Sequence, residues 1–524
     1  MPNRALDYLV IGAGPAGLQL GQLMAKAGRR YLILEAGPAP GMFFRTFPRH
    51  RTLISTNKKH TGTDDPELNL RMDWNSLLSD DPDLLFTRYS DRYFPAADDL
   101  VRYLGDFAER HELNIAYGTR AVRVARDGHG RFLVTDDHGE TRAAERVVVA
   151  TGFTRPNVPP IPGVETAELY GEHPTDPREY VDKRVLIIGK GNSAFETAEN
   201  LTETAAVIHV AGPRSLRLAW RTHFVGHVRA VNNNFLDTYQ LKSQNAVLDG
   251  EVRRIERRPD GRYLVTVAFV RADEITKDIP YDRVIVCTGF RLDASIFDAG
   301  CRPELTIADR FPALTPAYES VNVPGLFFAG TLTQSRDFKH GTSGFIHGFR
   351  YGARALHRIL EHRYHGAAWP GRALAADPGE LAAAVLARVN RSSALWQQFG
   401  VLADVIVLDG DGGARYLEEL PAGFQEPPVA GAGPGGHFTV TLDYGPGHDE
   451  ADPFDVSVTR IAQSDAAGAH EGHYLHPIVR HHLDGEVAAV HHVTENLEND
   501  WTSEEVHAAP LREFFARRTA SAPV

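Results

Sequence analysis

Short apolar runs that lead directly into glycine-rich turns organise the first part of the chain. The run at residues 8–11 enters the turn at 12–17, and the run at 185–188 enters the turn at 189–194. After each turn the apolar positions take up helical spacing, as in residues 18–27. A buried strand, a tight turn and an amphipathic helix in this order predict one βα unit of a parallel sheet, so the chain contains two such patterns.

Both turns carry the glycine spacing of a dinucleotide-binding loop, although the second ends in Ala194 where the first has a third glycine. Glycines at these positions let backbone N–H groups approach a pyrophosphate at a helix N-terminus. Two copies predict two dinucleotides, and hence a flavin that a nicotinamide nucleotide reduces. The predicted contacts are Gly12, Gly14, Pro15, Ala16 and Gly17 in the first turn and Gly189, Gly191, Asn192 and Ser193 in the second.

The residues after the second strand of each unit indicate which nucleotide it binds. Glu35 follows the run at 31–34, where a carboxylate hydrogen-bonds a ribose diol and repels a 2′-phosphate. Arg214 and Arg217 follow the run at 207–210, where guanidinium groups bind a 2′-phosphate. We therefore expect FAD in the first unit and NADPH in the second. The alternatives are a strand-end surface acid and a solvated pair of arginines.

Further segments extend the predicted flavin site. Residues 147–153 and 284–290 are buried-strand patterns that end in Thr-Gly-Phe, and residues 325–331 give a third strand-to-glycine pattern. A helical run over 344–361 follows, and its N-terminus could stabilise a reduced, anionic flavin ring. These patterns add Thr151, Gly152, Gly330 and Phe345 to the predicted flavin contacts, and Val122 is a further predicted contact.

The segment 41–59 is expected to run along the flavin ring because it continues from Glu35. It adds the predicted contacts Gly41, Met42, Phe43, Thr56 and Asn57. Asn57 is the candidate catalytic residue, since a neutral amide donates and accepts hydrogen bonds without adding charge. The alternative for Asn57 is an ordinary Asx-turn cap.

Composition narrows the classes of function. The net charge of −12 argues against a nucleic-acid partner, and no apolar run is long enough to span a membrane. The two cysteines lack a CxxC spacing, which favours a reducing cytoplasm and disfavours a built-in dithiol. The C-terminal part is rich in histidine without a recognised ligand pattern, so no metal site is predicted. Its histidines are His470, His473, His476, His481, His482, His491 and His492.

The motifs together resemble those of class B flavin-containing monooxygenases. The resemblance lies in the GAGPAG turn, in Glu35, and in the segments Gly-Met-Phe-Phe, Ser-Thr-Asn-Lys-Lys and Ala-Thr-Gly-Phe. Nearly the whole chain is similar to the FAD-dependent oxidoreductase domain-containing proteins, which include an endoplasmic-reticulum flavoprotein. That similarity lies in residues 73–79, 191–200, 237–243, 344–351, 475–477, 491–493 and 501–502. In the monooxygenases, the asparagine that matches Asn57 lies beside the flavin and helps to sustain a C4a-(hydro)peroxyflavin.

The resemblance implies an α/β fold with two Rossmann-like domains, for FAD and NADPH, of the flavin monooxygenase/disulfide-reductase type. An appended mixed C-terminal region follows them. The expected boundaries are 1–165 and 285–369 for the FAD domain, 166–284 for the NADPH domain and 370–524 for the appended region. The ends show neither a signal peptide nor a retention sequence, so we expect a bacterial, cytoplasmic enzyme.

The predicted function is FAD-containing, NADPH-dependent monooxygenation of a small organic substrate with O2. The family's fingerprint before the NADPH turn is shortened to residues 170–174, which leaves N-, S- or C-hydroxylation open rather than Baeyer–Villiger chemistry. One alternative is an NADPH-flavin oxidoreductase that passes electrons to a quinone, thiol or protein partner. Another is a flavin-binding interaction protein in which the C-terminal region does the work. A homodimer is an open alternative, and the sequence does not identify the substrate.

Overall fold

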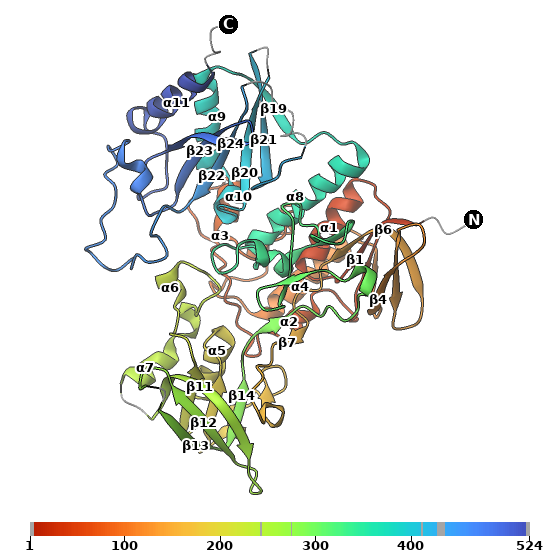
Figure 1. Cartoon of the computed structure of the whole chain (residues 1–524), viewed down its shortest axis with the longest axis vertical. Coiled ribbons are helices and arrows are strands. Elements are labelled where there is room, and N and C mark those ends of the chain that lie inside the picture. The colour runs from red at the N-terminus through yellow and green to blue at the C-terminus, as the bar shows by residue number, and fades with distance from the viewer. Residues whose placement is uncertain (1–4, 242–243, 274, 410–411, 427–434, 520–524) are drawn as a thin grey trace.

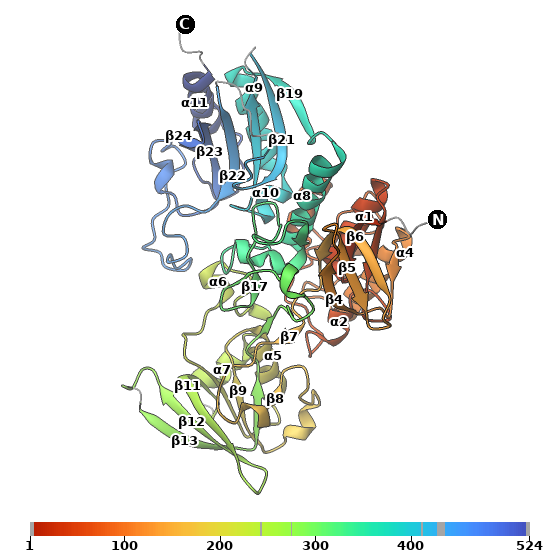
Figure 2. The same ribbon diagram turned by 45° about the vertical axis from the view of Figure 1, so that its right-hand side comes forward.

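The computed structural model describes residues 5–241, 244–273, 275–409, 412–426 and 435–519. Within these ranges the chain forms three parts, each built on one larger sheet, with the second part at the opposite end of the molecule from the C-terminal part (Figures 1 and 2). The predicted fold class, two Rossmann-like units and a mixed C-terminal region, is confirmed. No helix in the described ranges combines the length and apolar character that crossing a bilayer requires.

The first part is a seven-stranded sheet in the order β3-β2-β1-β6-β5-β4, with β18 paired to β6. The strands around β1 are parallel, while β4, β5 and the outer part of β6 form an antiparallel meander. The strands are β1 (Leu6–Ile11), β2 (Tyr31–Leu34), β3 (Ile115–Ala116), β4 (Ala121–Arg126), β5 (Phe132–Asp136), β6 (Thr141–Val149) and β18 (Leu326–Phe328). Its helices are α1 (Pro15–Lys26), α2 (Met42–Thr46), α3 (Pro66–Met72), α4 (Ala97–Arg110) and α8 (Ile346–His365).

The second part repeats the nucleotide-binding arrangement in a sheet of order β13-β12-β11-β10-β9-β14-β8. Its strands are β8 (Glu168–Leu169), β9 (Arg184–Ile188), β10 (Val207–Gly212), β11 (Ala246–Arg257), β12 (Tyr263–Phe269), β13 (Thr276–Tyr281) and β14 (Arg283–Val286). Its helices are α5 (Asn192–Leu201), α6 (Ala219–Thr222) and α7 (Asn234–Gln240). Strand β14 pairs with β9 and runs across the expected boundary at residue 284.

The C-terminal part is an antiparallel six-stranded sheet in the order β19-β21-β20-β22-β23-β24. Helices α9 and α11 pack on one face of it, around the fully buried Trp501. Its elements are β19 (Gly371–Ala375), α9 (Pro378–Arg391), α10 (Ser393–Gln397), β20 (Leu402–Leu408), β21 (Gly413–Pro421), β22 (His437–Asp443), β23 (His476–Leu483), β24 (Glu486–His492) and α11 (Ala509–Thr519).

Short elements complete the connections. Two-residue strands form the pairs β7 (Arg155–Pro156) with β15 (Phe290–Arg291) and β16 (Leu305–Thr306) with β17 (Phe311–Pro312). The 3-10 turns are Phe86–Arg88, Val164–Thr166, Pro177–Tyr180, Ala230–Asn232, Ala299–Cys301, Gly330–Arg336 and Gly468–Glu471, and Glu504–Ala508 is a π-helical turn.

A buried cluster of charges joins the C-terminal part to the first part. The Glu419 carboxylate, only 2% exposed, accepts hydrogen bonds from Arg354 at 2.6 Å, Arg358 at 3.0 Å and Arg388 at 3.0 Å. Arg388 also donates to the buried Asp404 at 2.9 Å. Burial opposes ionisation of Glu419, but the three guanidinium groups outweigh it and hold its pKa at about 2. The carboxylate is therefore charged at neutral pH.

Replacing Glu419 tests this junction. We expect Glu419→Gln to lower the free energy of unfolding by about 3–5 kcal/mol, because buried guanidinium groups lose their counter-charge. Urea unfolding followed by tryptophan fluorescence measures the change. The matched control is Arg391→Ala, which removes an exposed pair with Asp65 and should cost at most about 1 kcal/mol. Equal effects of the two substitutions would contradict the structural role of Glu419.

Candidate functional site

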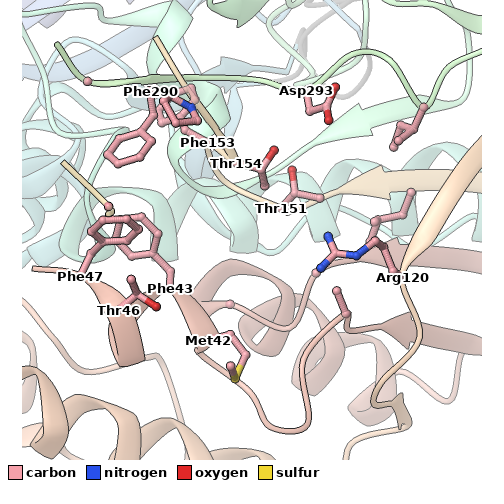
Figure 3. Close-up of a pocket in the computed structure, with 18 of the residues that line it drawn as sticks. Met42, Phe43, Thr46, Phe47, Arg120, Thr151, Phe153, Thr154, Phe290 and Asp293 are labelled. Carbon is pink, nitrogen blue, oxygen red and sulfur yellow. The ribbon is translucent and has the colours of Figure 1, made fainter. Parts of the chain in front are cut away.

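A cavity of about 800 Å³ lies between the first and second parts (Figure 3). This volume is in the range of small-molecule and cofactor sites. Gly12, Glu35 and Met42 line it from the first part, and Ser193, Cys287 and Phe290 line it from the second. Both glycine-rich turns therefore contribute residues to one cavity.

The first turn is shaped by contacts that only glycine permits. Gly12 has φ of +107°, and a Cβ there would lie 2.7 Å from the Ala150 carbonyl oxygen. A Cβ on Gly17 would lie 2.0 Å from the Gly12 carbonyl oxygen, so the start of α1 packs closely against β1. Gly14, in contrast, has open space where a Cβ would be. A phosphate group can approach the backbone at that point.

The N-terminus of α1 has no side-chain cap. Gly14 occupies the N-cap, Pro15 follows it, and no acid lies in the first turn. Helices α3 and α9 instead begin with Asp65 and Asp377, whose side chains accept the free N–H groups. The N–H groups of α1 therefore have no competing side-chain acceptor for an anion at this end of the helix.

Glu35 is held at the cavity wall by two backbone groups. Ala13 N–H donates to Oε2 and Gly37 N–H donates to Oε1, each at 2.8 Å. Each carboxylate oxygen retains capacity to accept a further hydrogen bond. The position and chemistry of Glu35 fit the ribose diol of FAD, as the sequence predicts.

The second turn repeats the geometry of the first. Gly189 has φ of +126°, and a Cβ there would lie 2.2 Å from the Cys287 carbonyl oxygen. Gly191 is the N-cap of α5, has open space beside it, and no side chain caps this helix either. The residues fit a second pyrophosphate at α5. Ser193 in the first turn of that helix lines the cavity.

The side chain of Asn192 holds a neighbouring loop in place. Its Nδ2 donates to the His227 carbonyl at 2.8 Å, and its Oδ1 accepts from Arg229 N–H at 2.9 Å and from Asn232 Nδ2 at 3.0 Å. These bonds fix the loop at residues 226–232 against the start of α5. Only the backbone of Asn192 remains for a nucleotide.

Arg214 and Arg217 are exposed and form no ion pair within the described residues. Lys339 comes near them from a distant part of the chain. Partial burial, and then Arg214 and Arg217, lower the pKa of Lys339. These three cations form no ion pair among the described residues, which leaves them free to bind a phosphate group. Lys339 escapes sequence reasoning because no local motif links it to β10.

The predicted site residues divide into two groups. Gly12, Gly14, Glu35, Met42, Phe43, Val122, Thr151 and Ser193 line the cavity. Pro15, Ala16, Gly17, Gly41, Thr56, Asn57, Gly152, Gly189, Gly191, Asn192, Arg214, Arg217, Gly330 and Phe345 do not. Several of these shape the backbone: a Cβ on Gly330 would lie 2.9 Å from that of Ala16, and a Cβ on Gly41 would lie 2.7 Å from Leu104.

A row of aromatic rings across the two parts lines the cavity and is missing from the predicted set. The Phe47 ring lies 5.4 Å from that of Tyr170 and 5.2 Å from that of Phe290. The Tyr170 hydroxyl donates to Glu196, whose pKa burial raises to about 7. Phe290 is the last residue of the Thr-Gly-Phe segment at 284–290, and Tyr170 is the first residue of the shortened fingerprint at 170–174. Both positions could therefore have been found from the sequence.

Asn57 is buried and has one unused hydrogen-bonding atom. Its Nδ2 donates to the Ser90 carbonyl at 2.7 Å and to the Arg92 carbonyl at 3.3 Å. Its Oδ1 has no partner, although the residue is only 2% exposed. A buried acceptor without a partner is costly, so a bound group with an N–H or O–H would stabilise this arrangement.

Trp74 follows the strand-like bridge between Asn57 and Asp73 and stacks on His347, with ring centroids 4.2 Å apart. His347 is 1% exposed, both of its ring nitrogens lack partners, and burial lowers its pKa well below the usual value. The Arg229 guanidinium lies 5.1 Å from the Trp74 ring. Residues of the first and second parts thus meet at Trp74.

The C-terminal part fixes the position of Trp74. The Arg71 carbonyl accepts from Trp74 Nε1 at 3.2 Å and from Gln397 Nε2 at 2.5 Å. The Arg71 guanidinium in turn donates to the Val389 carbonyl at 2.9 Å and to the Ser392 carbonyl at 3.2 Å. The appended region therefore contributes directly to the segment that carries Trp74 and pairs with Asn57.

The histidines of the C-terminal part form pairs. His476 Nε2 lies 2.9 Å from His492 Nδ1, and the rings of His437 and His482 stack at 4.6 Å. Across the described ranges, no three His, Cys, Asp or Glu side chains are arranged to hold a metal ion.

Comparison with known proteins agrees with this geometry. The family model for pyridine nucleotide-disulphide oxidoreductases matches residues 9–330. FAD-dependent oxidoreductase domain-containing protein 2 of Mus musculus is 40% identical over 98% of this chain and 84% of its own length. The Danio rerio protein of the same name is 38% identical over 98% of this chain and 83% of its own length.

Solved structures show the same fold over the nucleotide-binding parts. A flavin-containing monooxygenase from Stenotrophomonas maltophilia aligns with TM-score 0.52 and 21% identity, over 69% of this chain and 99% of that one. Bacillithiol disulfide reductase from Bacillus cereus aligns with TM-score 0.51 and 20% identity, over 69% of this chain and 100% of that one. At these identities the likeness concerns the fold alone.

The chain is therefore a flavin-dependent oxidoreductase. It belongs to the pyridine nucleotide-disulphide oxidoreductase family and, within it, to the FAD-dependent oxidoreductase domain-containing proteins. The predicted family and its relation in fold to flavin monooxygenases are confirmed. The expectation of a bacterial protein is wrong, because the relatives that match nearly the whole chain come from mouse and zebrafish.

Alanine substitutions separate the two nucleotide sites. We expect Gly12→Ala to lower FAD retention roughly 10- to 100-fold, because the Cβ meets a carbonyl in strained backbone. Gly189→Ala should retain FAD and weaken the binding of NADPH to a similar extent. Flavin absorbance after gel filtration and anaerobic reduction rates measure the two effects. Gly105→Ala, a helical site with open space, is the control and should change neither. Loss of FAD in Gly189→Ala would contradict the assignment.

Proposed function

We propose that the protein is an FAD-containing, NADPH-dependent monooxygenase of a small organic substrate, with O2 as co-substrate. The observation that carries the proposal is Asn57, a neutral, buried amide with an unpartnered Oδ1 in the segment predicted to run along the flavin. Both cysteines of the chain are free and buried, so no disulfide in this structure supports a thiol relay. A cytoplasmic location remains part of the proposal and rests on the same cysteines.

The residues that line the cavity fit FAD. Its pyrophosphate would lie at the uncapped N-terminus of α1, and Glu35 would accept hydrogen bonds from its ribose. Val122 and Met42 line the same cavity and would contact the rest of the nucleotide. Bound FAD supplies the redox chemistry, since it takes electrons from NADPH and passes them to oxygen.

NADPH would bind to the second part. The N-terminus of α5 would hold its pyrophosphate, and Arg214, Arg217 and Lys339 would neutralise its 2′-phosphate. The aromatic row of Phe47, Tyr170 and Phe290 would exclude water from the space between the two parts.

Asn57 would orient a bound group by accepting one hydrogen bond. Its Nδ2 is committed to the carbonyls of Ser90 and Arg92, so the side chain cannot rotate without losing both bonds. The acceptor is therefore positioned before a ligand arrives, which lowers the cost of ordering it later. Trp74 and the neutral His347 would form the adjoining apolar wall.

The second candidate is an NADPH-flavin oxidoreductase without oxygen insertion. The match to the disulphide oxidoreductase family favours it, since the family name refers to electron transfer to a disulphide. In this chain Cys287 lines the cavity as a lone thiol, and burial raises its pKa. The dithiol would have to come from a partner.

Reoxidation of the reduced holoenzyme separates the two candidates. After anaerobic reduction with NADPH and mixing with oxygenated buffer, we expect a transient spectrum distinct from both reduced and oxidised flavin. Asn57→Ala should shorten its lifetime about tenfold and release more peroxide, because one hydrogen bond is lost. Stopped-flow absorbance and a peroxide assay measure this. Asn322→Ala, an exposed amide in a loop before β18, is the control. Direct reoxidation of the parent would favour the oxidoreductase.

The preference for NADPH over NADH tests the proposed role of Arg214 and Arg217 in binding the 2′-phosphate. We expect Arg214→Ala and Arg217→Ala each to raise the KM for NADPH by roughly 10- to 100-fold, the worth of a hydrogen bond to a charged group. The KM for NADH should stay unchanged, because NADH lacks the 2′-phosphate. Arg178→Ala, an exposed arginine paired with Asp176 on the same part, is the control. An equal loss for both nucleotides would remove these arginines from phosphate recognition.

A further inference from the structure

A second cavity, of about 300 Å³, lies where the three parts of the molecule meet. Thr222 and His223 at the end of α6 line it from the second part, and His340 lines it from the first. The C-terminal part contributes Phe399 and the loop at residues 443–450. No residue lines both this cavity and the cofactor cavity, so the two are separate sites.

The second cavity is acidic. Asp443, Asp449 and Glu450 line it, no Lys or Arg among the described residues does, and the His340 Nδ1 lies 3.0 Å from Asp449 Oδ2. Burial lowers the pKa of His223 and, together with His223, lowers the pKa of His448 to about 3. These two imidazoles are neutral at pH 7 and add no positive charge to the cavity. From β23, Arg480 and His476 face Asp443, whose pKa burial raises above its usual value.

Rings form the apolar wall of the cavity. His448 lies between His223, at 3.9 Å between ring centroids, and Tyr444, at 3.7 Å. The edge of Phe399 meets the Tyr444 ring at 5.0 Å. Aromatic faces beside carboxylates attract organic cations through both the ring quadrupole and the charge.

One atom in this wall lacks a partner. His448 is only 6% exposed, and it hydrogen-bonds the backbone of His473. Its Nε2 has no partner. The neutral ring with its other nitrogen paired to a backbone carbonyl leaves Nε2 as a hydrogen-bond acceptor. The protein itself supplies no donor to that acceptor, so a ligand with an N–H group would complete the site.

We propose that this second cavity binds a small organic amine in its ammonium form. The ammonium would donate a hydrogen bond to His448 Nε2, lie near the carboxylates of Asp443 and Asp449, and place its carbon chain against Tyr444 and Phe399. A metal ion fits less well, because the described residues contain no group of three ligands arranged for one. The inference is independent of the reaction at the flavin.

Binding there would hold two parts of the molecule together. Beside the cavity, the Trp220 ring of α6 packs against the Phe454 ring, with 5.1 Å between the ring centroids. The Nε of Arg221, also on α6, lies 3.6 Å from Asp452 Oδ2. These contacts link α6 to the loop that carries His448. An amine bound to His448, whose ring stacks on His223 of the second part, would strengthen the contact between the second part and the C-terminal part.

Titration calorimetry on the FAD-loaded protein tests the proposal with 2-phenylethylamine and its neutral analogue 2-phenylethanol. We expect one amine bound per chain with Kd below about 1 mM, and the alcohol at least about tenfold weaker, because it lacks the charge. Asp443→Asn and His448→Phe should each raise the Kd for the amine by roughly 10- to 100-fold. Both should keep the flavin content and the rate of flavin reduction by NADPH.

Glu471→Gln, an exposed acid outside the cavity, is the control and should bind the amine as the parent does. His448→Phe keeps a ring in the stack but removes both the Nε2 acceptor and the bond to the His473 backbone, so retained flavin content shows that the variant is folded. The proposal is wrong if no amine binds below about 1 mM, if the alcohol binds equally well, or if both cavity variants bind like the parent.

Discussion

The charge cluster at Glu419 holds the C-terminal part against the first part of the molecule. It joins α8, α9 and β21, and Arg388 extends it to Glu67 on α3 at 3.2 Å. Because the cluster is buried, its members cannot exchange partners with water, and its geometry is fixed by several bonds at once. Helix α8 begins beside the predicted flavin site and α3 leads to Trp74, so the cluster holds two elements that continue toward that site.

The two nucleotide turns show how similar constraints recur in one chain. At each turn a glycine at positive φ lies against the carbonyl that ends a neighbouring strand, Ala150 for Gly12 and Cys287 for Gly189. Each following helix lacks a capping side chain, whereas α3 and α9 have one. Other helices, such as α4 and α8, also lack a side-chain cap, so it is the uncapped N-terminus together with the glycine turn that suits a phosphate.

Local patterns predicted the parts of the site that local geometry determines. The turns at Gly12 and Gly189, the carboxylate of Glu35 and the family follow from short motifs in which strand, turn and helix are adjacent in sequence. Contacts between distant segments could not be predicted: Lys339 joins Arg214 and Arg217, and Gln397 reaches Arg71, only in the folded chain. Asn192 shows the converse, since its motif position suggested a cofactor contact while its side chain holds a neighbouring loop.

The shared carbonyl of Arg71 has a consequence for how this protein can be divided. Removing the C-terminal part would take away Gln397, which bonds the same atom as the Trp74 indole, and would strip the cover from apolar residues that share a core with α8. A truncated chain would therefore differ from the intact one at the segment that carries Trp74 as well as at its end. The appended region is part of the enzyme's architecture, and its sequence is constrained together with that of the nucleotide-binding parts.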